Sequence, residues 1–188
     1  MTKDYVAVLD ACALVGAGVR DTLLRLAEHP RLYVPKWSDD IIAETARTLQ
    51  QRFGKTPDQT THLRSELLNA FPEAWVRGYK ELELGLRCDE KDRHVLAAAI
   101  RCNAQTIVTF NLKHFPLAAL AEYDIEAIHP DEFLVNQFHL DCSIVTLKFT
   151  EQCASISRTP ADQIRRLHST KALPLFTRTL ADAFSISL

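Results

Sequence analysis

Residues 5–10 (YVAVLD) decide the fold of this chain. The first five form a short apolar run with two β-branched positions, which predicts a strand that is buried on both faces. Asp10 follows that strand directly, and a carboxylate in such a place is costly to desolvate unless a cation meets it. In open α/β sheets, ligands bind at the carboxyl ends of the strands. The sequence therefore predicts a ligand site around Asp10 at one edge of a sheet.

Strand and helix patterns alternate outward from this run. Short apolar runs predict three further strands, and apolar residues at helical spacing predict helices between them. This order favours parallel pairing of the strands through right-handed crossovers. The strands are expected at 32–35, 106–110 and 125–128, and the helices at 19–28, 38–53, 57–70 and from about 89 to 103.

Capping residues set the bounds of two of these helices. Ser38 is predicted to cap the N-terminus of one helix, and Gly54 is predicted to end it. Thr56 precedes Pro57 and Gln59, which is the pattern of a capping box with a proline in the first turn. Residues 73–88 show no clear pattern.

The pattern becomes all helical from residue 129 onward. Helices are expected from 130, over 141–156 and from 160, and the second is weakened by three consecutive β-branched residues at 144–146. We therefore expect an α/β fold with a parallel sheet flanked by helices over residues 1–130. A small all-helical C-terminal region is expected over 131–188.

Composition excludes several classes of protein. The 188 residues are 47% hydrophobic and 24% charged, which is typical of a soluble globular protein. The five cysteines are scattered without a CxxC pair, so neither a zinc ribbon nor a disulfide framework is indicated. No window resembles a membrane span or a signal peptide, and we expect a cytoplasmic protein. A net charge of −2 gives no global basic field, so nucleic acid would have to be attracted by local patches or by a partner.

Two more acidic residues, Glu44 and Asp92, fall where they can reach the edge that carries Asp10. Asp89 is three residues from Asp92 at a helix start, so both can face the same way. Carboxylates are the ligands that Mg²⁺ and Mn²⁺ prefer, and such ions support phosphodiester chemistry by acidifying water and neutralising phosphoryl charge. A purely structural alternative stays open for each residue: Asp10 and Asp89 as helix caps, and Glu44 as a solvated helix residue.

Asn111 and His114 follow the strand at 106–110. Asn111 either caps the next helix or offers its carbonyl to a metal or to a metal-bound water. His94, one turn into the helix after Asp92, is within reach of the same site, although a structural role is favoured for it.

Other active-site classes lack their motifs in this chain. There is no GxSxG, Walker loop, GxGxxG or HExxH. An aspartyl-phosphate phosphatase needs a second aspartate two residues after the first, and that position holds Cys12. The seven histidines show no paired spacing for a metal.

Four segments together resemble the PIN domain, the nuclease fold of VapC-type toxins. They are VLDACALV at 8–15, SDDIIAETARTL at 38–49, DEKDRHVLAAAI at 89–100 and TIVTFNLKHF at 106–115. The resemblance covers about residues 5–130, and the helical tail resembles the C-terminal extension of some longer PIN toxins. It implies a metal-dependent endoribonuclease that is held inactive by an antitoxin.

The resemblance places Asp10, Glu44 and Asp92 at the three principal acidic positions of the family. The fourth falls at Asn111, where many members carry aspartate, and a position that is often acidic is His114. Loss of one charge is expected to weaken binding of a second metal, which Asp89 can partly offset.

We therefore expect Asp10 and Asp92 to ligate Mg²⁺ or Mn²⁺ while RNA is hydrolysed. Glu44 would complete the site or hold a water, Asp89 would assist, and Asn111 would orient a water. Candidate contacts to the RNA backbone are Lys36, Lys113, His114, Arg165 and Arg166.

The expected partners are RNA, a cognate antitoxin and a second copy of the chain. A non-catalytic PIN-like scaffold that binds RNA or protein remains an alternative, kept open by Asn111. A DNA-directed nuclease of related fold is a third possibility. The sequence does not identify the RNA target, because base selectivity depends on loop geometry.

Overall fold

The computed structural model describes residues 5–188, which form two compact units. The first unit contains residues up to 15 together with 33–128, and the second contains 16–32 together with 129–188. The sequence prediction had placed 16–32 in the first domain. In the structure these residues group with the C-terminal helices. The predicted division into domains 1–130 and 131–188 stays a prediction.

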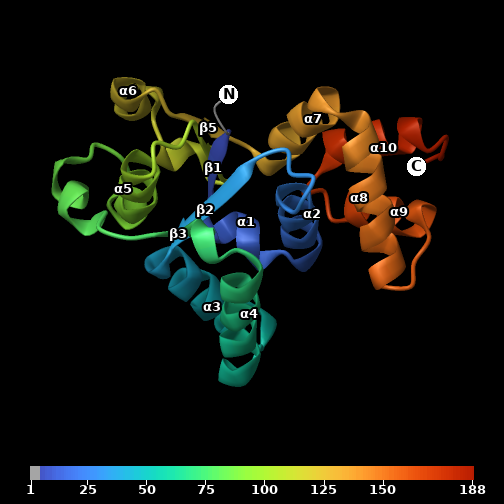
Figure 1. Ribbon diagram of the computed structural model, residues 1–188, viewed down its shortest axis with the longest axis horizontal. Coiled ribbons are helices and arrows are strands. Elements are labelled where there is room, and N and C mark those ends of the chain that lie inside the picture. The colour runs from blue at the N-terminus through green and yellow to red at the C-terminus, as the bar shows by residue number, and fades with distance from the viewer. Residues whose placement is uncertain (1–4) are drawn as a thin grey trace. The chain divides into compact units, whose positions relative to one another are not determined.

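The first unit is built on a five-stranded parallel sheet, which confirms the predicted α/β fold (Figure 1). The strand order is β3-β2-β1-β4-β5, so β1 and β4 are both internal. Leu9 is in register with Val108, and the residues that follow these two strands therefore come side by side at the carboxyl edge. The strands are β1 Val6–Leu9, β2 Val34–Ser38, β3 Trp75–Val76, β4 Thr106–Val108 and β5 Glu126–Ile128.

Helices of the first unit pack against this sheet and against one another. Helix α5 carries a run of five buried residues, 95–99, and contacts β1, β2 and β4. Helix α3 contacts α1 and α4 (Figure 1). The α-helices are α1 Ala11–Val15, α3 Asp39–Phe53, α4 Pro57–Ala70, α5 Arg93–Arg101 and α6 Leu117–Leu120, with 3₁₀ turns at Pro72–Ala74, Lys80–Gly85, Glu90–Asp92, Leu112–His114 and Ala121–Tyr123.

The predicted helix caps are confirmed. The Ser38 hydroxyl accepts a hydrogen bond from the Ile41 amide at 3.2 Å, and Gly54 ends α3 with a left-handed φ of 63°. Thr56 and Gln59 exchange reciprocal hydrogen bonds at the start of α4, which is the expected capping box.

Two strands differ from their predicted bounds. The second was expected at 32–35 and lies at Val34–Ser38, so it runs directly into the residue that caps α3. The fourth was expected at 106–110 and ends at Val108, because the Thr109 side chain turns the backbone by accepting a hydrogen bond from the Asn111 amide. The short strand β3 was not predicted.

The second unit is helical throughout its regular elements. Helix α2 buries Val19, Leu23 and Leu26 and contacts α8, and the Thr22 hydroxyl donates to Gln152 Oε1 at 3.0 Å within this core. Its helices are α2 Ala17–Ala27, α7 Pro130–Leu140, α8 Cys142–Ser155, α9 Pro160–Ser169 and α10 Pro174–Ala183.

Helix α10 was not predicted from the sequence. Its N-cap residue, Leu173, provides no side-chain cap. The buried carboxylate of Asp131 on α7 accepts hydrogen bonds from the Leu175 amide at 2.9 Å and the Phe176 amide at 2.7 Å instead. Asp131 thus caps α10 from a distant part of the chain.

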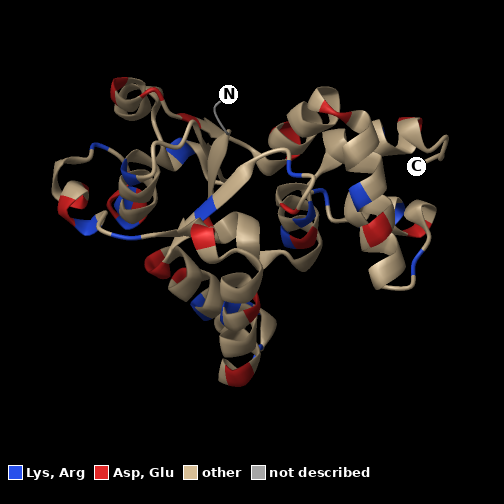
Figure 2. Cartoon of the chain, in the orientation of Figure 1, with Lys and Arg blue, Asp and Glu red and all other residues tan. Residues whose placement is uncertain are grey.

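No helix among residues 5–188 combines the length and the hydropathy that crossing a bilayer requires. Figure 2 shows acidic and basic residues interspersed along the chain in each unit, in keeping with the small net charge.

Candidate active site

Asp10 lies at the carboxyl end of β1 and is almost fully buried, with 2% of its surface exposed. Its amide donates to the carbonyl of Val108 at 3.1 Å, which continues the pairing of β1 with β4 beyond the last strand residue. Its Oδ2 accepts a hydrogen bond from the Thr109 hydroxyl at 2.6 Å and another from the Cys12 thiol at 3.0 Å. Both bonds fall on the same oxygen, so Oδ1 is the oxygen left for a cation.

The two groups that hold Asp10 are themselves held by backbone amides. The Asn111 amide donates to Thr109 Oγ1 at 3.0 Å, and the Phe110 amide donates to Cys12 Sγ at 3.2 Å. Burial and the charge of Asp10 raise the pKa of the Cys12 thiol to about 12, so the thiol stays protonated and donates. The carboxylate is therefore fixed in orientation by a closed set of hydrogen bonds.

Glu44 reaches the site from α3. Ser38 fixes the start of that helix, and the buried side chains of Ile41 and Thr45 fix its rotation, so Glu44 is placed beside the packed stripe. Burial is the main cause that raises the pKa of Glu44, followed by the negative charge of Asp10. The charge of Asp92 raises it further, while His94 and Arg47 act in the opposite direction.

Asp92 comes from the turn before α5 and is 7% exposed. Burial raises its pKa most, and the charges of Asp10 and Asp89 add to this effect. His114 opposes the shift, because its Nδ1 lies 2.9 Å from Asp92 Oδ2. Asp89 is exposed and accepts a hydrogen bond from the Lys91 amide through Oδ1, as its predicted capping role requires.

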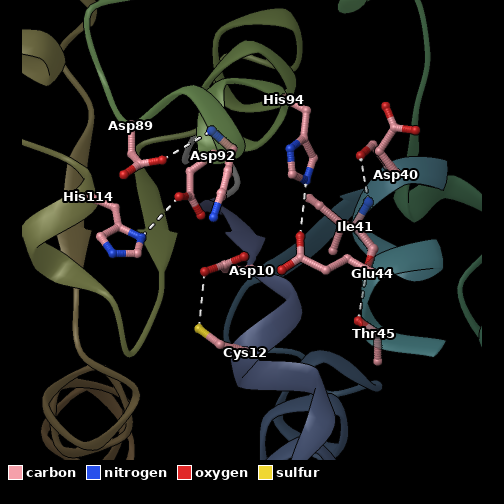
Figure 3. Close-up of polar contacts among 12 residues, drawn as sticks. Asp10, Cys12, Asp40, Ile41, Glu44, Thr45, Asp89, Asp92, His94 and His114 are labelled. Carbon is pink, nitrogen blue, oxygen red and sulfur yellow. Dashed lines mark hydrogen bonds and ion pairs between the residues drawn. The ribbon is translucent and has the colours of Figure 1, made fainter. Parts of the chain in front are cut away.

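Figure 3 shows the side chains of Asp10, Glu44 and Asp92 facing one another, although they come from β1, α3 and the turn before α5. The charge of Asp10 acts on both of the other carboxylates. Segments that are distant in sequence thus bring three acidic groups together, and the charge of Asp10 opposes ionisation of both Glu44 and Asp92.

The donors around these carboxylates fit a divalent cation. Among residues 5–188, the ion pairs of Glu44 and Asp92 are with His94 at 3.6 Å and His114 at 2.9 Å, and no lysine or arginine forms an ion pair with the three carboxylates. Asp89, Asp92 and His114 each offer one ligand atom, and these atoms lie within 4.8 Å of one another. Oxygen and imidazole donors gathered in this way are typical of a divalent metal site.

The turn after β4 places two further predicted residues near the carboxylates. Asn111 precedes the turn Leu112–His114, and its side chain makes no capping hydrogen bond to that turn, so the capping alternative is not supported. Its predicted role toward a water stays a prediction. Lys113 is exposed in the same turn, next to His114.

The other predicted RNA contacts are not part of this cluster. The Lys36 ammonium donates to the Glu73 carbonyl. Burial raises the pKa of Cys102, and the charge of Lys36 opposes this rise; Cys102 lies at the opposite end of α5 from Asp92. Arg165 and Arg166 are exposed on α9 in the second unit. The roles of these three residues in binding RNA remain predictions.

Sequence reasoning missed the roles of Thr109 and Cys12. Parallel pairing of β1 with β4 makes Thr109 a spatial neighbour of Asp10, so the pairing itself was a signal for Thr109. His94 lies two residues past Asp92, and its Nε2 is 3.6 Å from Glu44 Oε2 (Figure 3), while the structural role favoured for it stays a prediction.

Comparison with known proteins agrees with this architecture. A family model described as PIN domain matches residues 6–113, which is more than half of the chain. A protein of Mycobacterium tuberculosis named "Putative ribonuclease VapC50" is 51% identical over 72 residues, which cover 38% of this chain and 43% of that relative. The resemblance predicted from the sequence is confirmed: this chain belongs to the PIN domain family.

Proposed function

We propose that this chain is a Mg²⁺- or Mn²⁺-dependent endoribonuclease and the toxin of a toxin–antitoxin pair. The observation that carries the proposal is that Asp10, Glu44 and Asp92 face one another in a PIN domain (Figure 3). Burial and the charge of Asp10 oppose the ionisation of Glu44 and Asp92, and a shared cation offsets this cost. The ribonuclease named above, similar over 72 residues, supports RNA as the substrate.

Each residue has a distinct part in the proposed reaction. A divalent ion supplies Lewis acidity, which acidifies water and neutralises phosphoryl charge. Asp10 and Asp92 would hold the ion, with Asp10 presenting Oδ1 because Thr109 and Cys12 occupy Oδ2. Glu44, whose pKa is raised, would orient the attacking water and accept its proton, and Asp89 would assist in holding the ion.

The test is a cleavage assay on purified full-length protein with a labelled single-stranded RNA and the matching DNA. Cleavage of RNA is expected with Mg²⁺ or Mn²⁺ and is expected to stop with EDTA. Asp10→Asn should abolish it, whereas Glu66→Gln, which changes an exposed carboxylate on α4, should not. Metal-independent cleavage, or an Asp10→Asn variant as active as wild type, would overturn the proposal.

Two other outcomes would favour the alternatives. RNA binding without cleavage at any metal concentration would support a non-catalytic scaffold, which Asn111 in place of a fourth carboxylate keeps open. Preferential cleavage of the DNA strand would support a DNA-directed nuclease.

The partners follow from the same proposal. Co-expression with the protein encoded beside this chain should suppress cleavage if that protein is the antitoxin. Light scattering on the isolated chain tests the predicted homodimer. The cytoplasm is the proposed location, because a toxin and its antitoxin would meet RNA there.

A further inference from the structure

His114 contacts the carboxylate of Asp92 directly, which binding to an RNA phosphate does not require. Its Nδ1 is 2.9 Å from Asp92 Oδ2, and its ligand atom lies within 4.8 Å of those of both Asp92 and Asp89. Two ligand atoms that bind one ion at about 2.1 Å and at right angles are about 3.0 Å apart. The spacing of His114 and Asp92 therefore suits two neighbouring ligands of one ion.

Backbone hydrogen bonds hold this arrangement in place. The Asp89 amide donates to the His114 carbonyl at 3.1 Å, which ties the turn before α5 to the turn after β4. The His114 amide donates to the Asn111 carbonyl at 2.9 Å, and the Asp92 amide donates to the Asp89 carbonyl at 3.0 Å. The backbone positions of the three residues are thus set before any ion binds, as preorganised metal sites require.

From this geometry we propose that His114 is a metal ligand through Nδ1, and that the site consequently favours Mn²⁺ and other first-row transition ions over Mg²⁺. The proposal rests on the metal dependence proposed above and adds the identity of the ion. Mg²⁺ takes oxygen ligands almost exclusively and gives up its waters reluctantly. Imidazole nitrogen suits transition ions, whose affinities rise from Mn²⁺ through Co²⁺ to Ni²⁺.

The charge of the ligands acts in the same direction. Carboxylate ligands attract Mg²⁺ by their negative charge, whereas a neutral imidazole ligand adds none. Figure 3 shows the His114 ring on the side of Asp92 away from Glu44, so nitrogen and oxygen donors flank the buried carboxylate from two directions.

A competing arrangement predicts a different result. His114 could donate its Nδ1 proton to Asp92 and only orient that carboxylate, as residues behind metal ligands commonly do. Removing such a residue weakens binding of every ion by a similar factor. Removing a nitrogen ligand changes the preference between ions, and this difference separates the two roles.

The experiment is a calorimetric titration of full-length protein with MnCl₂ and with MgCl₂ at pH 7.5. The variants are His114→Asp, which replaces nitrogen by oxygen, His114→Ala, and the control His62→Asp on the exposed face of α4. The ratio of Mn²⁺ to Mg²⁺ affinity should fall by about tenfold or more in both His114 variants. It should stay unchanged in His62→Asp.

A spectroscopic measurement on the same samples gives a second readout. Electron spin-echo modulation of bound Mn²⁺ should show coupling to nitrogen in wild type, and this coupling should disappear in His114→Asp and His114→Ala. An unchanged affinity ratio, or the same nitrogen coupling in all variants, would overturn the assignment.

These readouts do not depend on RNA cleavage. If the affinity ratio changes in the His114 variants but the protein cuts no RNA, His114 is a metal ligand and the proposed nuclease function is wrong. If the protein cuts RNA with metal but the ratio is unchanged, the nuclease function stands and the assignment of His114 as a ligand is wrong.

Discussion

Replacing Thr109 by valine tests how the buried carboxylate of Asp10 is held. Valine keeps the shape of threonine and removes its hydroxyl, which donates to Asp10 Oδ2 at 2.6 Å and accepts from the Asn111 amide at 3.0 Å. Thr109 has no exposed surface, so water cannot replace the lost hydroxyl without local opening.

The expected cost follows from these two hydrogen bonds. A hydrogen bond to a charged group contributes about 1.5–3 kcal/mol, and a buried donor left without an acceptor costs about 1 kcal/mol more. Thr109→Val should therefore lower the free energy of unfolding of the first unit by about 2–4 kcal/mol. Thr109→Ser keeps the hydroxyl and loses one methyl group, which costs about 1 kcal/mol.

The assay is urea denaturation in EDTA, followed by tryptophan fluorescence. Both tryptophans, Trp37 and Trp75, lie in the first unit, so the signal reports that unit. Thr109→Val should also weaken Mn²⁺ binding by about 10–100-fold, because Asp10 loses the bond that orients it. Equal stability and equal Mn²⁺ affinity in the valine and serine variants would refute the reasoning.

Three further outcomes are expected. The pKa of Glu44 is raised in the folded protein, so its ionisation destabilises the fold as pH rises above the ordinary pKa of 4.5. Glu44→Gln should therefore raise the free energy of unfolding of the metal-free protein at pH 7.5. A less stable variant would contradict this. Asp131→Ala should lower the stability of the second unit by about 2–3 kcal/mol in far-UV circular dichroism, because two amides of α10 lose their acceptor, while Asp131→Asn should lose less. A thiol-specific reagent at pH 8 should label exposed Cys142 rapidly and should reach Cys12 only on unfolding, since burial and Asp10 raise the pKa of that thiol to about 12.

The parts of the structure that follow from local patterns were predictable. Strand β1 is short and apolar, and the capping residues of α3 and α4 act within four positions of their own helix. These features place Asp10 at a strand end and Glu44 on a helix with a defined start. The predicted meeting of acidic residues at one sheet edge depends on little more than parallel pairing.

The features that sequence reasoning missed depend on distant contacts. Helix α10 begins where Asp131 on α7 caps it, and the sequence near Pro174 contains no local signal for this distant contact. Strand β3 has two residues, which is too short for an alternating pattern. The pairing of His114 with Asp92 follows from a backbone bond between two turns, and no spacing in the sequence encodes it.

The central claim is that Asp10 and Asp92 bind one divalent cation beside Glu44. The most direct measurement is the Mn²⁺ affinity of full-length wild type, Asp10→Asn and the surface control Glu66→Gln, determined by calorimetry at one pH. The account predicts that Asp10→Asn lowers the Mn²⁺ affinity by about 10–100-fold and that Glu66→Gln leaves it unchanged. An Asp10→Asn variant that binds Mn²⁺ as tightly as wild type would contradict it.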